Sequence, residues 1–404
     1  MSGGPWLTLI GIGEDGRDGL SPAAARALAQ AELVVGAKRH LDLAAPIAAE
    51  TLQWPSPLTD ALPAILARRG TAVVVIASGD PFFYGVGTLL CQSIAPNEMM
   101  VLPGISSFSL AAARLGWSLQ DCELISLHGR PFERLIPALQ PGARILALSW
   151  DGTTPAKVVE ELTKRGLGGS RVCVLEAMGG RRERVRHATA EGFDLADIDA
   201  LNVVAVEVVA AAGAKVLPLT AGRAADCFEH DGQITKREVR AMALAALAPR
   251  RGELLWDIGA GSGSIGIEWM LAHAANRAIA IEPRADRTER IRRNALALGV
   301  PDLTVIEGPA PAAFAGLSPP QAIFIGGGGT TPGLIEAALA ALPPGGRLVA
   351  HAVTLETEML LVEAYKRYGG ELTQIAVSHA EPLGGFLGWW PARPVVQWRL
   401  ETAR

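Results

Sequence analysis

Residues 254–269, "LLWDIGAGSGSIGIEW", carry the strongest fold signal in this chain. An apolar run leads straight into a glycine-rich segment, and a helical pattern begins immediately afterwards. The three alternating glycines are Gly259, Gly261 and Gly263. A strand that turns through glycines directly into a helix is the first half of a βαβ unit in a parallel sheet. The stretch therefore predicts an open α/β sheet with this turn at the carboxyl end of one strand.

The same organisation extends outward in both directions. Short β-branched runs alternate with Ala- and Leu-rich helical patterns, which indicates βαβ units and parallel sheets in both halves. The pattern breaks at residues 211–230, where glycine, proline and mixed polar residues cannot continue a sheet. We expect one domain over 1–212, a linker over 213–229 and a second domain over 230–404. The last two strands should form an antiparallel hairpin around a long glycine- and tryptophan-rich loop, residues 378–393.

Composition limits the possible partners. The 404 residues are 49% hydrophobic and 19% charged, with a formal net charge of −4. The absence of a long Lys/Arg block argues against nucleic-acid and membrane-surface partners and favours a small-molecule substrate. The four cysteines are far apart and form no CxxC pair, so we expect reduced thiols, no metal site and a cytoplasmic location. No membrane-spanning or signal segment is apparent.

An acidic residue indicates what the glycine turn binds. The next apolar run ends in Glu282, about 25 residues after Asp257, where a carboxylate can accept both hydroxyls of a ribose. Ser264 stands where the dinucleotide pattern has its third glycine, so the turn is not built to cradle a pyrophosphate. This favours S-adenosylmethionine over NAD. The alternative is that the glycines only make a tight turn in a sheet that binds nothing.

A second glycine loop near the N-terminus matches the dinucleotide-binding pattern in its glycine spacing but not in the structure predicted around it. Gly11, Gly13 and Gly16 have the fingerprint spacing. However, the first helix start is the Ser21–Pro22 pair, several residues further on, and the next apolar run does not end in an acid. We therefore predict that this loop lies beside a substrate rather than holding NAD.

Several longer stretches resemble known methyltransferases. "DGQITKREVRAMALAALAPRRGELLWDIGAGSGSIGIEW" and "IEGPAPAAF" resemble the C-terminal unit of the precorrin-6Y C5,15-methyltransferases (decarboxylating) of cobalamin biosynthesis. "IASGDPFFYGVG" and "LPGISSFSLAAARLG" resemble the tetrapyrrole methylases, which form the C5-methylating unit of the same family. The resemblance implies an N-terminal two-lobed tetrapyrrole methylase fold and a C-terminal Rossmann-like fold. It also implies one S-adenosylmethionine per domain, a tetrapyrrole substrate and a homo-oligomer.

The resemblance also implies which residues contact the cofactor. In the N-terminal half these are Ser78, Gly79, Asp80, Phe83, Ser106 and Ser107. In the C-terminal half they are Thr235, Gly259, Ala260, Gly261, Ser262, Gly263, Glu282 and Ala310. Two stretches depart from the family pattern. Residues 308–311 read "GPAP" where the family has "GDAP", and residues 13–16 read "GEDG" where it has "GPGD".

The implied chemistry is methylation at C5 by the N-terminal unit, and methylation at C15 with loss of the ring-C acetate carboxyl by the C-terminal unit. His351 is a candidate for proton transfer, with a structural role as the alternative. Arg393, beside two adjacent tryptophans, is a candidate carboxylate clamp, with hairpin packing or a subunit interface as the alternative. The basic cluster at 181–187 is either a solvated hairpin or a second clamp.

Other functions and residues stay open at this stage. His40 and His128 lie at strand ends and are interpreted as surface or cleft-lining groups. An NAD-dependent oxidoreductase would use the second glycine turn for a nicotinamide cofactor. A non-catalytic tetrapyrrole-binding protein would bind the ring without S-adenosylmethionine.

Overall fold

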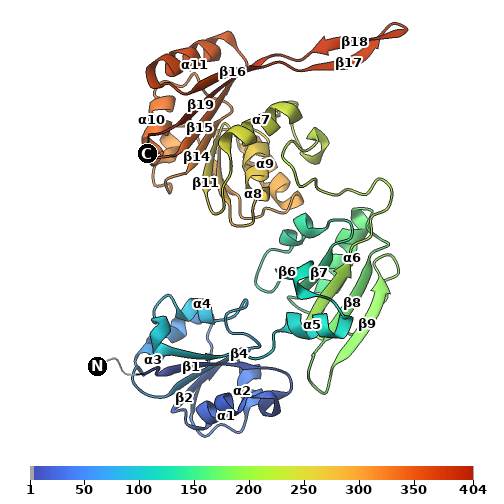
Figure 1. Cartoon of the computed structure of the whole chain (residues 1–404), viewed down its shortest axis with the longest axis vertical. Helices are drawn as coiled ribbons and strands as arrows, with labels where there is room; N and C mark the ends of the chain where they lie inside the picture. The colour runs from blue at the N-terminus through green and yellow to red at the C-terminus, as the bar shows by residue number, and fades with distance from the viewer. Residues whose placement is uncertain (1–3, 404) are drawn as a thin grey trace. The chain divides into compact units, whose positions relative to one another are not determined.

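The computed structural model describes residues 4–403, which divide into two compact units (Figure 1). Unit 1 comprises residues up to 130 and 138–216, and unit 2 comprises residues 131–137 and those from 217 onward. Leu217 and Phe228, inside the predicted 213–229 linker, are buried in the core of unit 2. The short 131–137 segment is attached to unit 2 by the Arg134–Asp302 ion pair. The proposed division of activities between 1–212 and 230–404 stays a prediction.

The first sheet of unit 1 is fully parallel, as predicted. Its strand order is β3-β2-β4-β1-β5. The strands are β1 (Leu7–Ile12), β2 (Leu33–Gly36), β3 (Glu50–Gln53), β4 (Val73–Ser78) and β5 (Met99–Leu102). The helices are α1 (Pro22–Ala29), α2 (Lys38–Ala44), α3 (Leu62–Leu66) and α4 (Gly87–Leu90). The predicted start of α1 is confirmed, because the Ser21 side chain accepts a hydrogen bond from the Ala24 N–H.

The second sheet of unit 1 differs from the parallel sheet that the sequence predicted. Its order is β6-β7-β10-β8-β9, and β6–β7 is its parallel pair, whereas β7–β10, β10–β8 and β8–β9 are antiparallel. The strands are β6 (Cys122–Ser126), β7 (Arg144–Leu148), β8 (Arg171–Glu176), β9 (Arg184–Thr189) and β10 (Asn202–Glu207), with helices α5 (Ser107–Leu115) and α6 (Thr154–Lys164). The basic cluster lies in β9 and the turn before it, so this segment returns as a hairpin rather than crossing over through a helix.

Unit 2 is built on one large sheet of order β13-β12-β11-β14-β15-β19-β16. The strands are β11 (Leu254–Ile258), β12 (Arg277–Glu282), β13 (Thr304–Glu307), β14 (Ala322–Ile325), β15 (Arg347–Ala352), β16 (Glu371–Ile375) and β19 (Val395–Glu401). The helices are α7 (Arg237–Leu247), α8 (Ser264–Leu271), α9 (Ala285–Ala297), α10 (Leu334–Ala341) and α11 (Leu355–Tyr368). The first five strands are parallel, and β19 runs antiparallel to both neighbours. The expected α/β class is confirmed.

Alternate residues of this sheet enter two different cores. Leu255 and Phe324 pack with residues of α7, α8 and α9, whereas Leu254 and Ile323 pack with residues of α10 and α11. Figure 1 shows these two groups of helices beside the sheet of unit 2. A strand buried on both faces has to be apolar throughout, which is why β11 reads as a continuous apolar run. Among the described residues, none of the helices is long and apolar enough to cross a membrane.

The C-terminal segment corrects one detail of the prediction. The residues expected to form a loop between two final strands are themselves a hairpin, β17 (Ser378–Leu383) paired with β18 (Phe386–Pro391). This pair forms a separate two-stranded sheet and extends away from the main sheet (Figure 1). The glycines in this segment favoured a loop. Instead, Gly384 and Gly385 form a two-residue turn, and the residues on either side of it pair as antiparallel strands.

Candidate functional site

In unit 2 the chain passes from β11 into α8 through a turn built on three glycines. Gly259, Gly261 and Gly263 have φ angles of 68°, 59° and 75°, which other residues rarely adopt. A Cβ atom on Gly259 would lie 2.7 Å from the Gly327 backbone, and one on Gly263 would lie 2.8 Å from the Ile291 side chain. A Cβ on Gly261 would have no atom closer than 3.8 Å. Two glycines therefore permit close packing, and the third leaves an open surface.

Two carboxylates support this turn from buried positions. Glu282 is 2% exposed, and its oxygens accept hydrogen bonds from the Gly261 N–H at 2.9 Å and the Arg284 N–H at 3.3 Å. Asp257 accepts the Gly266 N–H at 2.9 Å, and burial raises the pKa of its carboxyl to about 7. Asp257 therefore holds the start of α8. Glu282 has further lone pairs for a ligand beside the glycine turn.

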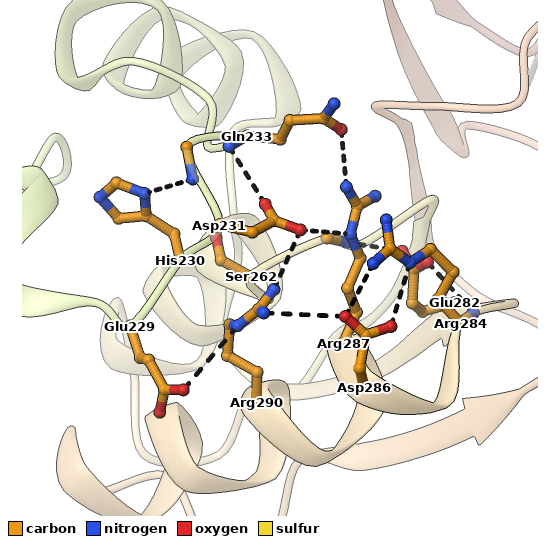
Figure 2. Close-up of polar contacts among 12 residues, drawn as sticks. Glu229, His230, Asp231, Gln233, Ser262, Glu282, Arg284, Asp286, Arg287 and Arg290 are labelled. Carbon is orange, nitrogen blue, oxygen red and sulfur yellow. Dashed lines mark hydrogen bonds and ion pairs between the residues drawn. The ribbon is translucent and has the colours of Figure 1, made fainter.

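Residues 229–233 are bound to α9 by hydrogen bonds and ion pairs, as Figure 2 shows. The Asp231 carboxylate accepts a hydrogen bond from Arg287 Nε at 3.0 Å and lies 3.2 Å from Arg290 Nη1. Arg287 also donates to Gln233 Oε1 at 2.7 Å. Desolvation acts to raise the pKa of Asp231, but the Gln233 N–H and the Arg287 guanidinium lower it to about 2. The carboxylate therefore stays charged and keeps this segment attached.

Asn294 connects that segment to the glycine turn. Its amide nitrogen donates to the carbonyls of Glu229 and Ser262, each at 2.9 Å, and its amide oxygen accepts the Glu229 N–H at 2.8 Å. Within the described residues, the buried Ser262 hydroxyl has no hydrogen-bond partner. A buried hydroxyl of this kind calls for a partner that the described residues do not supply.

The other sequence-predicted residues of unit 2 lie in three places. Ala310 follows β13 and is half-buried, so it shares the carboxyl edge of the sheet with the glycine turn. Thr235 precedes α7, where its carbonyl accepts a hydrogen bond from Arg240 at 2.5 Å. Arg393 is exposed in the connection from β18 to β19. The fold therefore brings Ala310 to the same sheet edge as the glycine turn, and it leaves Arg393 on a separate segment.

His351 lies within the sheet itself. Its Nε2 is 2.9 Å from Gln397 Oε1 on the antiparallel neighbour β19, and its ring makes an edge contact with Phe324 at 5.0 Å between centroids. Burial lowers the pKa of His351, partly offset by the Gln397 hydrogen bond. The side chain is therefore neutral at physiological pH, and in this structure it joins β15 to β19.

In unit 1 three motifs meet through their glycine backbones. A Cβ on Gly11 would lie 1.7 Å from the Gly79 carbonyl and 2.2 Å from the Gly104 nitrogen, and the Gly104 N–H donates to the Gly79 carbonyl at 3.0 Å. The ends of β1 and β4 and the loop before α5 thus touch at positions where no side chain fits. The first glycine loop, "SGDP" and "PGISS" form one assembly at the carboxyl edge of the first sheet.

The residues of unit 1 that are predicted to contact the cofactor lie next to these glycines in the chain. Ser78 is exposed at the end of β4, and its hydroxyl lies 2.7 Å from Arg39 Nη2 and 2.8 Å from His40 Nε2. Asp80 accepts the Phe82 N–H at 2.8 Å. Ser106 caps α5, whose first residue is Ser107, by accepting the Ser109 N–H at 3.1 Å. Phe83 stacks on Tyr84 with ring centroids 5.3 Å apart.

Most arginines of the basic cluster are engaged by carboxylates of unit 1. Arg184 and Arg186 bind the fully buried Glu176 at 2.6 and 2.8 Å. Arg182 pairs with Asp199 and also lies 3.4 Å from Glu14, in the first glycine loop. These contacts favour the structural interpretation of the cluster as a hairpin, because its charges already have partners.

The sequence did not predict the residues that hold the glycine turn of unit 2 and residues 229–233 in place. Asn294, Arg287 and Arg290 come from one face of α9, where they follow the spacing of an ordinary charged surface helix. Nothing local marks their partners in residues 229–231, which lie more than 50 residues earlier in the chain. Gly327 lies in a run of four glycines, residues 326–329, and its approach to Gly259 appears only in three dimensions.

Comparison with known families identifies both halves. The sequence model described as "Tetrapyrrole (Corrin/Porphyrin) Methylases" matches residues 7–194, and that described as "Precorrin methyltransferase domain" matches residues 226–402. Together these two matches span nearly the whole chain, one for each unit.

Individual relatives are similar over the whole chain or part of it. A Sinorhizobium protein named precorrin-6Y C(5,15)-methyltransferase [decarboxylating] is 57% identical over 98% of this chain and 96% of its own. A Salmonella typhimurium cobalt-precorrin-7 C(5)-methyltransferase is 34% identical over 44% of this chain and 88% of its own. A Pyrobaculum calidifontis protein, a probable cobalt-precorrin-6B C(15)-methyltransferase (decarboxylating), is 36% identical over 40% of this chain and 85% of its own.

The relatives and the matching family models define an S-adenosylmethionine-dependent methyltransferase. Both family models agree with that class. The chain belongs to the family of precorrin-6Y C(5,15)-methyltransferases (decarboxylating).

Proposed function

We propose that the chain methylates precorrin-6Y at C5 and C15 and removes carbon dioxide from the ring-C acetate, giving precorrin-8. Unit 1 carries out C5 methylation, and unit 2 carries out C15 methylation and decarboxylation. The relatives named for a single methylation, C5 or C15, each match less than half of the chain, which supports this division. The proposed location is the cytoplasm.

One observation carries the proposal most directly, namely that each unit has its own glycine-built assembly at the carboxyl edge of a parallel sheet. In unit 1 this is the Gly11–Gly79–Gly104 contact, and in unit 2 it is the turn beside Glu282. Ligands of open α/β sheets bind at this edge. Two such sites support one S-adenosylmethionine per unit.

S-adenosylmethionine, when bound, supplies a methyl group activated by its sulfonium. The protein's part is to bind and orient. In unit 2, we propose that Glu282 binds the ribose, and that the open side of Gly261 and the Ser262 hydroxyl, which has no partner among the described residues, contact the rest of the molecule. In unit 1, we propose Ser78, Gly79, Asp80, Phe83, Ser106 and Ser107 for the same role. His351 remains our candidate for proton transfer in unit 2, and its bond to Gln397 fixes the ring orientation.

Calorimetric titration of the full chain with S-adenosylhomocysteine tests the proposal. We expect a stoichiometry near two per chain, because each unit offers a separate site. A value near one would assign the cofactor to a single unit. Absence of binding together with stabilisation by nicotinamide cofactors would favour an oxidoreductase, and binding of a tetrapyrrole alone would favour a carrier.

The β17–β18 hairpin supports the proposed homo-oligomer. Its aromatic residues are unusually exposed, with Phe386 at 83%, Trp389 at 77% and Trp390 at 66%. These indoles therefore do not pack under the hairpin. An isolated two-stranded hairpin is marginally stable by itself, and large exposed apolar surfaces mark interaction sites. We propose that these residues are covered by a second copy of the chain.

Arg393, at the base of this hairpin, is proposed to bind a substrate carboxylate. Arg393→Ala should then raise KM about tenfold for C15 methylation and decarboxylation, because a guanidinium–carboxylate pair is lost. The melting temperature and the affinity for S-adenosylhomocysteine should not change. A lower melting temperature or a split oligomer, with normal turnover per folded chain, would assign Arg393 a structural role instead.

A further inference from the structure

An exposed tryptophan lies in a hydrogen-bonded turn after a strand of the second sheet of unit 1. Trp150 is 58% exposed and lies two residues after the end of β7. Its backbone N–H and that of Asp151 donate to Thr154 Oγ1 at 3.1 and 3.2 Å, and Asn202 donates to the Asp151 carbonyl at 3.2 Å. The backbone therefore holds Trp150 in place although its ring is largely outside the core.

His128 extends this aromatic surface. It follows the parallel neighbour β6, and its ring lies against Trp150 with centroids 5.6 Å apart and planes 30° from parallel. The carboxyl ends of two parallel strands thus bring both rings to one edge of the sheet. Their stacking gives a flat surface wider than one indole.

A cation without a carboxylate partner lies two residues after His128. The Arg130 guanidinium is 5.2 Å from the centroid of the Tyr84 ring, and among the described residues it forms no ion pair with an acid. This differs from Arg182, Arg184 and Arg186, whose charges are already paired. Arg130 is therefore available to bind an anion.

Tyr84 connects this surface to the proposed cofactor loop. Its hydroxyl donates to the Leu124 carbonyl in β6 at 3.0 Å, and its ring stacks on Phe83, three residues after Asp80. The loop that carries the "SGDP" motif is thereby docked on the edge strand of the second sheet. A ligand that touches Arg130 and Trp150 would lie close to that loop.

We propose that Trp150, backed by His128, and Arg130 form the substrate-binding surface of unit 1. The indole contacts the face of the tetrapyrrole, and Arg130 binds one of its carboxylates. A large flat ring with several carboxylates needs both an apolar plane and a planar cation. This inference rests on the proposed C5 methylation by unit 1, and it names positioning residues for that reaction.

The test uses the full chain with Trp150→Ala and Arg130→Ala. Each should raise KM for C5 methylation about tenfold and leave C15 methylation and both S-adenosylhomocysteine affinities unchanged. Trp150→Phe should recover most of the loss because it keeps an aromatic plane. Arg69→Ala is a matched control, since Arg69 also lies over an aromatic ring, Trp6, but at the opposite end of the first sheet.

A second measurement does not depend on turnover. Calorimetric binding of uroporphyrin III, a stable flat polycarboxylic tetrapyrrole, should weaken about tenfold in both variants at one class of site. If KM for C5 methylation and uroporphyrin affinity both stay within twofold of wild type, the surface is not used and the inference is wrong. If wild type itself does not methylate C5, the proposed function of unit 1 fails, and uroporphyrin binding still decides whether this surface binds the ring.

Discussion

Glu282→Ala should weaken S-adenosylhomocysteine binding to unit 2 at least tenfold. The carboxylate is buried and already accepts the Gly261 and Arg284 N–H groups, so its remaining lone pairs can take a ribose diol in two charge-assisted hydrogen bonds. Such bonds contribute roughly 1.5–3 kcal/mol each. The substitution also leaves the Gly261 N–H without its acceptor, which loosens the turn that the cofactor would contact.

Titration of the full chain separates this effect from general damage. Glu282→Ala should remove one of two binding classes and leave C5 methylation intact. Asp80→Ala is the reciprocal variant, because Asp80 lies in the proposed cofactor loop of unit 1. It should impair C5 methylation and spare C15 methylation. If Glu282→Ala binds as tightly as wild type at both sites, the cofactor of unit 2 must lie elsewhere.

Glu268→Ala should reduce the free energy of unfolding of unit 2 by about 3–5 kcal/mol, the usual effect of breaking a buried ion pair. Glu268 accepts hydrogen bonds from the Gly222 and Arg223 N–H groups at 2.7 and 2.9 Å and from Arg240 Nε at 2.9 Å. Arg240 is fully buried, and its guanidinium lies 4.8 Å from the Phe228 ring centroid. Without Glu268 the buried Arg240 loses its carboxylate partner, and the Gly222 and Arg223 N–H groups lose their acceptor.

Urea unfolding of the full chain, followed by hydrogen exchange to assign the transition to unit 2, measures this loss. Glu289→Ala is the matched control. Glu289 pairs with Arg292 on the exposed face of α9, and exposed pairs contribute only about 0–1 kcal/mol. A loss below about 1 kcal/mol for Glu268→Ala would show that the segment before α7 does not depend on this network.

The amino-acid sequence by itself determined the features that depend on residues close together in the chain, such as turns and helix starts. The strand, glycine turn and helix at 254–269 could be predicted because positive φ angles demand glycine. The start of α1 followed from a capping serine and a proline. The position of Glu282 beside the turn could be predicted because a parallel neighbour strand places its last residue there.

Only the tertiary structure decided how distant segments meet. The sequence predicted a parallel second sheet in unit 1, but β9 returns as an antiparallel hairpin that brings Arg184 and Arg186 onto Glu176. Apolar alternation is the same in both strand directions, so it cannot report orientation. The stacking of Trp150 on His128 likewise depends on strand register. Contacts between residues far apart in the chain have no local signal, because either partner alone is compatible with many environments.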